Sequence, residues 1–119
     1  MRLPIQYALY YPKRVFLNGE RLDFTTLTQI SFQKPDLDAF SGLQYAYDAI
    51  KTGGSMPTVL NAANELAVAK FLNREIQFLE IYEIIQTCMD AHNNIENPTV
   101  EDILATEKWV YETIESRWN

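Results

Sequence analysis

The feature that most constrains the fold is the segment from Pro57 to Asn73, which is apolar on nearly every side when it is wound as a helix. A helix that is apolar almost all round is usually a buried one. Its alanines would let neighbouring helices approach closely. The sequence therefore predicts a helical domain around this segment, whose apolar residues are Val59, Leu60, Ala62, Ala63, Leu66, Ala67, Val68, Ala69, Phe71 and Leu72.

Three more segments carry helical periodicity. The first has apolar residues at helical spacing from Leu37 to Ile50, with Asp36 as a suitable N-cap and Gly53-Gly54 as a stop signal. The second, from Phe78 to Ala91, has a single apolar stripe. These two segments flank the buried helix on either side in the sequence.

The last predicted helix begins after Thr99. Thr99 and Asp102 resemble a capping box, although Asp is shorter than the preferred Glu, and apolar residues then recur up to Trp118. Because short links join the four predicted helices, we predict a mainly α fold whose residues 36–119 form an antiparallel four-helix bundle.

Residues 1–35 do not resemble the start of a compact domain. A short helix is predicted from Ile5 to Tyr11, with Pro4 in its first turn and Pro12 as its stop. The alternation from Leu27 to Phe32 predicts a β-strand. A lone strand needs a partner for its backbone groups, and no later segment offers one. We therefore expect an extended N-terminal arm whose strand pairs with a sheet in another domain or another copy of the chain.

Composition limits the classes of function. The net charge is −6, of which residues 1–34 contribute +3 and the rest of the chain is acidic. An acidic body should repel phosphate backbones, which argues against nucleic-acid binding. No apolar run approaches the roughly 18–20 residues that a bilayer span needs. Cys88 is the only cysteine, which fits a reducing compartment, so we expect a cytoplasmic protein or one resident in a plastid-type organelle.

The best polar cluster is formed by Asn61, Asn64 and Glu65, whose spacing places them on one face of a helix. Glu65 could serve as a base or metal ligand that the asparagines orient. The cluster could instead tie the buried helix to a neighbouring loop through side-chain hydrogen bonds to the backbone. We favour the structural role, because a carboxylate by itself does not make a site.

Other candidates for chemistry are weaker. Cys88 and His92 are four residues apart, but two ligands without a third make a poor metal site, and a helix-interior cysteine is usually inert packing. A small hydrolase that uses this pair is therefore disfavoured. Gly53-Gly54 is an isolated pair and not a phosphate loop. Four basic residues of the arm could bind phosphate but are scattered in sequence, so solvation is the favoured interpretation: Arg2, Lys13, Arg14 and Arg21.

A resemblance to a known family rests on short blocks in a fixed order. Leu60 to Glu65 matches the family block L-N-A-A-N-E in full, and Ser41-Gly42 departs from the usual Pro-Cys. The other matching blocks are Met1 to Leu9, Pro12 with Arg14, Leu22 to Phe24, Phe32 to Asp36 and Ile76 to Ile81. Together they make the chain similar to the C-terminal portion of the 1-deoxy-D-xylulose 5-phosphate reductoisomerase family.

The resemblance implies an NADPH-dependent enzyme that uses a divalent metal, Mg or Mn, and acts as a homodimer. Its reaction converts 1-deoxy-D-xylulose 5-phosphate into 2-C-methyl-D-erythritol 4-phosphate in the non-mevalonate route to isoprenoids. In this family the catalytic, cofactor-binding and metal-binding residues precede the matched stretch. Only Met1 corresponds to a residue that borders the substrate and nicotinamide pocket.

The resemblance also implies a division of the chain. Residues 1–35 would be a linker arm that belongs to the missing catalytic domain, and residues 36–119 would be the C-terminal helical domain. This part would support the active site and would be inactive alone, binding no cofactor. The competing hypothesis is a free-standing helical protein-interaction module.

Overall fold

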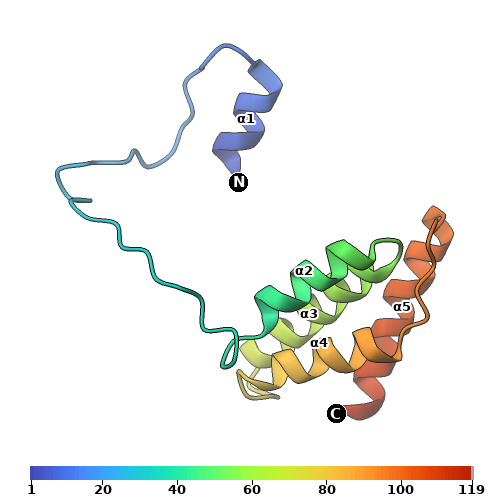
Figure 1. Ribbon diagram of the computed structural model, residues 1–119. Coiled ribbons are helices and arrows are strands. Elements are labelled where there is room, and N and C mark those ends of the chain that lie inside the picture. Colours follow the sequence, from blue (N-terminus) through green and yellow to red (C-terminus); the bar gives the residue numbers. More distant parts are fainter. Residues whose placement is uncertain (119) are drawn as a thin grey trace. The chain divides into compact units, whose positions relative to one another are not determined.

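The structure is a computed structural model that describes residues 1–118, and these contain five helices (Figure 1). The chain divides into two compact units, Met1–Gln33 and Lys34–Asn119. The first unit holds one helix and the second holds four. A mainly helical fold was predicted, and this prediction is confirmed.

The first unit contains helix α1, Arg2–Tyr10. It begins three residues earlier than predicted, with Pro4 in its first turn, where a missing N–H costs no helical hydrogen bond. After the helix the chain turns back, and the Gln6 side-chain Nε2 donates a 2.9 Å hydrogen bond to the Phe16 carbonyl oxygen. The guanidinium of Arg14 lies 4.4 Å from the centre of the Tyr7 ring. These two contacts hold the segment after α1 against the helix.

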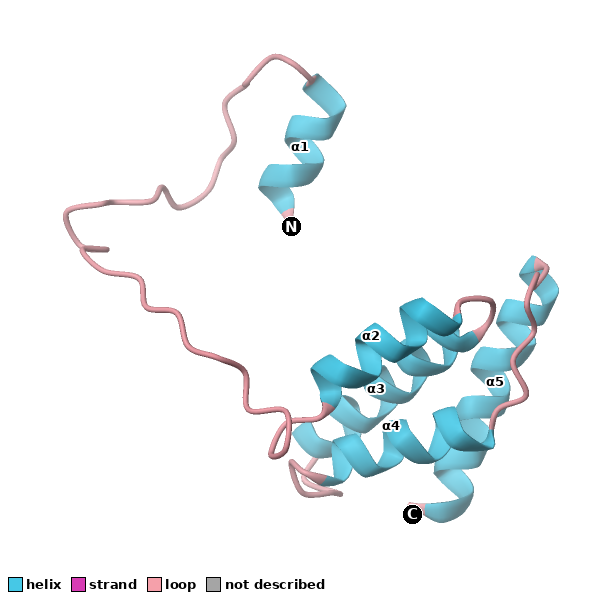
Figure 2. Cartoon of the chain, viewed as in Figure 1, coloured by secondary structure: helices cyan, strands magenta, loops and turns pink. Residues whose placement is uncertain are grey.

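The strand predicted from Leu27 to Phe32 is not formed. Within residues 1–118 these positions have no regular secondary structure (Figure 2). Phe32 is 91% exposed. An isolated extended segment has no partner for its backbone N–H and C=O groups, so the β-favouring composition alone does not produce a strand.

Helix α2, Gly42–Thr52, begins six residues after the predicted N-cap Asp36. Asp36 caps a separate turn, where its Oδ1 accepts from the Ala39 N–H at 3.0 Å. After this turn the ring of Phe40 packs edge-on against Phe78, with centroids 6.3 Å apart. The predicted stop is confirmed, since Gly53 takes a φ of +66° and its N–H donates to the Ala49 carbonyl.

The remaining helices are α3, Met56–Leu72, α4, Glu80–Ala91, and α5, Val100–Arg117. The predicted capping box of α5 is confirmed. Thr99 Oγ1 accepts from the Asp102 N–H at 3.2 Å, and Asp102 Oδ2 accepts from the Thr99 N–H at 2.9 Å.

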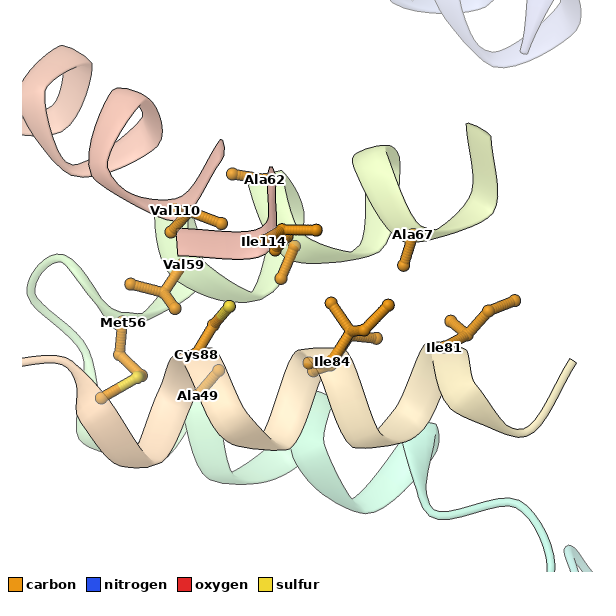
Figure 3. Close-up of a cluster of buried hydrophobic side chains, with 12 residues drawn as sticks. Ala49, Met56, Val59, Ala62, Ala67, Ile81, Ile84, Cys88, Val110 and Ile114 are labelled. Carbon is orange, nitrogen blue, oxygen red and sulfur yellow. The ribbon is translucent and has the colours of Figure 1, made fainter. Parts of the chain in front are cut away.

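Helices α3 and α4 form a central pair, and each of them contacts every other helix of the second unit. Successive helices α2, α3 and α4 run in alternating directions, while α5 crosses them (Figure 1). Within the described residues α2 and α5 do not contact each other. The core lies between α3 and its neighbours (Figure 3), as the all-round apolar pattern predicted. The finer expectation of an antiparallel four-helix bundle stays a prediction.

Candidate functional site

The predicted polar cluster lies on the surface of α3, where Asn61, Asn64 and Glu65 are all exposed. Ala62 and Ala63, which lie between Asn61 and Asn64 in the sequence, are buried. The three polar residues therefore share the exposed face of the helix. The charge of Glu65 has a small effect on Tyr111 of α5. There the pKa of Tyr111 is raised mainly by its hydrogen bond to Glu107, and in small part by Glu65. The structural tie expected of this cluster stays a prediction.

Met1 stands 93% exposed at the start of the first unit. It lines an apolar cavity of about 410 Å³ together with α1 residues Ile5 and Leu9 and with Leu17. Its expected place beside a substrate pocket stays a prediction.

The basic residues of the arm are only partly brought together. Lys13, Arg14 and Arg21 line one cavity of about 390 Å³, and Arg2 lines a different one. The Arg14 and Arg21 guanidinium groups lie against aromatic rings of the same unit. Aromatic faces attract such cations, so these rings help to hold the side chains in place.

Cys88 and His92 have different surroundings. Cys88 is fully buried in the core, and burial raises the pKa of its thiol to about 11, so the thiol stays protonated at neutral pH. His92 follows α4, and its Nε2 lies 2.7 Å from Ser55 Oγ. A protonated, inaccessible thiol is a poor nucleophile, which argues against the hydrolase interpretation.

The most highly organised polar site joins two connections of the second unit that are far apart in sequence. We call it the Ser55 junction, and it comprises Ser55, His92, Asn94 and Ile95. Ser55 Oγ accepts from the Ile95 N–H at 2.9 Å, and the Ser55 N–H donates to the Ile95 carbonyl at 3.0 Å. Asn94 Oδ1 accepts from the Ser55 N–H at 3.1 Å. The junction therefore ties the α2–α3 connection to the α4–α5 connection.

The surroundings of the junction favour a structural role. Ser55 is fully buried although it is polar, and its hydroxyl has partners within 3.2 Å on His92, Asn94 and Ile95. The His92 ring packs beside Trp109, with centroids 5.2 Å apart. Burial lowers the pKa of His92 and so favours the neutral ring. A serine beside a neutral histidine resembles a nucleophile and its base, but this hydroxyl cannot reach a substrate.

Sequence reasoning missed this junction. Its one local signal is the glycine pair before Ser55, which was interpreted only as a helix stop. Gly54 has a φ of +59°, and a Cβ added to it would collide with the Ile95 carbonyl oxygen. The glycine is therefore required by the close approach of the two connections as well as by the turn.

Residues 1–118 carry neither a metal-binding cluster nor a membrane-spanning helix. No group of three or more His, Cys, Asp or Glu side chains there could hold a metal ion. In the same residues no helix combines the length and apolarity that crossing a membrane requires.

Comparison with known proteins places this helical domain in a family. The profile described as the DXP reductoisomerase C-terminal domain matches residues 1–113. The chain is 59% identical over 118 residues to the 1-deoxy-D-xylulose 5-phosphate reductoisomerase of Lachnospira eligens, and 55% identical over 119 residues to that of Thermoanaerobacter pseudethanolicus. Each match covers 99% of this chain and 31% of the relative.

Solved structures agree. The Zymomonas mobilis enzyme in complex with NADPH is 39% identical, with a TM-score of 0.80 over 97% of this chain and 30% of that one. A DOX-P reductoisomerase structure with fosmidomycin and magnesium is 32% identical, with a TM-score of 0.79 over 98% of this chain and 31% of that one. The chain belongs to the DXP reductoisomerase C-terminal domain family. It spans about 31% of the length of the relatives it matches.

Proposed function

We propose that this chain is the supporting helical part of an NADPH-dependent reductoisomerase. The enzyme converts 1-deoxy-D-xylulose 5-phosphate into 2-C-methyl-D-erythritol 4-phosphate in non-mevalonate isoprenoid biosynthesis. The observation that carries the proposal is the family match over residues 1–113, together with a chain that spans only 31% of its relatives. The helical unit braces the catalytic part, and the chemical groups lie in the part of the relatives that precedes the matched segment.

The cofactors of the reaction belong to the upstream part of the enzyme in this proposal. NADPH and magnesium are named with solved relatives. The family resemblance implies magnesium or manganese as the metal of this enzyme. Residues 1–118 offer no cluster of three or more metal-ligating side chains. Ser55 is fully buried, and its hydroxyl has hydrogen-bond partners on His92 and Asn94. In this proposal both cofactors bind in the upstream part of the enzyme, as the family resemblance implies.

The arm has a place in this proposal. Residues 1–35 form the linker that belongs with the catalytic part, and residues 36–119 form the C-terminal domain, arranged as an antiparallel bundle. Leu27 to Phe32 becomes a strand when a sheet of the catalytic part supplies its partner. The exposure of Ile30 and Phe32, 65% and 91%, supports such a partner. The full enzyme is a homodimer in the bacterial cytoplasm, and Met1 borders its substrate pocket.

The test is reconstitution from two pieces. The upstream portion of the Lachnospira eligens relative is mixed with this chain, and NADPH oxidation is followed with 1-deoxy-D-xylulose 5-phosphate and magnesium. We expect oxidation only when both pieces are present. If the two pieces fold and associate but remain inactive, the reductoisomerase proposal fails and the helical interaction module takes its place.

A further inference from the structure

Helix α2 has an apolar side that the rest of its unit leaves open. Leu43, Tyr47 and Ile50 follow one another at spacings of four and three residues, so they lie along one face of the helix. Their exposed fractions are 44%, 56% and 73%. Single exposed apolar residues are ordinary, but a row of three large ones along one helix is the kind of patch that marks an interaction surface.

The opposite side of α2 is already in use. Ala49 is fully buried and Tyr45 packs against the core, and the Tyr45 hydroxyl donates a 3.0 Å hydrogen bond to Gln86 Oε1 on α4. These contacts hold α2 to the central pair of α3 and α4. The outer row is not among the residues that pack against the core.

The polar residues of α2 lie apart from both its buried apolar side and its exposed apolar side. Gln44 Nε2 donates a 2.8 Å hydrogen bond to Asp48 Oδ1, and Lys51 is exposed. A helix that only faced water on its outer side would carry polar residues there as well. The outer row contains no charged residue, so burying it would leave no ionised group without water.

We propose that the outer face of α2, defined by Leu43, Tyr47 and Ile50, docks against the upstream catalytic part of the same protein. This inference rests on the proposed function. More than two-thirds of each relative lies outside the segment that this chain matches. That remaining part of the protein is large enough to cover the outer face of α2.

The length of the tether argues for that partner over a second copy. The first compact unit ends at Gln33 and α2 begins at Gly42. Because an extended chain covers about 3.3–3.6 Å per residue, the intervening residues span at most about 28 Å. If residues 1–33 pack in the catalytic part, this short connection keeps α2 close to that part. Docking within one chain also avoids most of the entropy cost of bringing two molecules together.

The experiment measures the affinity of this chain for the upstream portion of the Lachnospira eligens relative by isothermal titration calorimetry. Tyr47→Gln and Ile50→Gln remove apolar surface from the outer face, while Lys51→Gln on the polar side of the same helix is the matched control. Truncating an interface anchor typically raises Kd tenfold or more. We expect each outer-face variant to show at least that rise and Lys51→Gln to bind like the wild type.

Two controls separate folding from docking. All three changes lie at exposed positions, so their thermal unfolding should match that of the wild type. Equal affinity of the wild type and the outer-face variants would overturn the inference while leaving the proposed function intact. Concentration-dependent self-association of the wild-type chain in light scattering, abolished by Ile50→Gln, would also overturn it, because a second copy would then be the partner. No binding of any form would instead count against the proposed function and remove the basis of the inference.

Discussion

Replacing Ser55 by alanine should reveal how strongly the Ser55 junction stabilises the helical unit. The hydroxyl is fully buried and accepts from the Ile95 N–H at 2.9 Å. It also lies 2.7 Å from Nε2 of His92. Ser55→Ala removes a hydrogen-bond partner of both groups. A buried polar group that loses its partner costs about 1–3 kcal/mol, so the free energy of unfolding should fall by about 2–3 kcal/mol.

Chemical denaturation followed by circular dichroism measures this loss directly. For a unit of this size, a loss of 1 kcal/mol lowers Tm by about 4–8 °C. The Tm of Ser55→Ala should therefore be roughly 10–20 °C below that of the wild type. Ser116→Ala is the matched control, because Ser116 is exposed on α5 and its hydroxyl bonds only to a nearby backbone carbonyl, that of Thr113. We expect the control to change stability by less than about 0.5 kcal/mol. A Ser55→Ala loss as small as that of the control would refute the reasoning.

Three further perturbations test other contacts of the helical unit. Gly54→Ala should lower the free energy of unfolding by more than about 1 kcal/mol, because the positive φ and the Ile95 carbonyl both oppose a Cβ, and an unchanged denaturation midpoint would contradict this. Thr99→Ala should cost about 1 kcal/mol in thermal unfolding, because α5 loses the cap that accepts from the Asp102 N–H, and the absence of a shift would show that the cap is not needed. The free energy of unfolding should also fall as the pH drops below about 6.5. Burial lowers the pKa of His92 in the folded unit, so the unfolded chain binds the proton more readily. The same pH dependence in His92→Gln would assign the effect to other groups.

Much of the helical unit could be predicted because its signals are local. The all-round apolar character of α3 predicted its central place, because a helix with apolar residues on most sides needs neighbours on most sides to cover them. Thr99 and Asp102 predicted the start of α5, because a capping box involves only residues three apart. Gly53 predicted the end of α2, because its positive φ suits a residue without a side chain.

The errors arise where distant residues decide the structure. Asp36 is a good cap by sequence, but it caps a separate turn, and Phe40 at the end of that turn packs against Phe78, a residue far along the chain. The residues that form the Ser55 junction are separated by about 40 positions in sequence, so no local pattern brings them together. The strand predicted from Leu27 to Phe32 is not formed in the described residues, because a β-favouring composition does not by itself supply the partner that a strand needs.

The central claim is that this chain supports chemistry located in the upstream part of the protein. A chimera tests it most directly: the C-terminal third of the Lachnospira eligens relative, the part that this chain matches at 59% identity, is replaced by residues 1–119 of this chain. NADPH oxidation is then measured beside the parent and beside a truncated parent that lacks the segment. We predict that the chimera restores most of the parental kcat while the truncated form is inactive. A truncated form as active as its parent, or a folded but inactive chimera, would contradict the account.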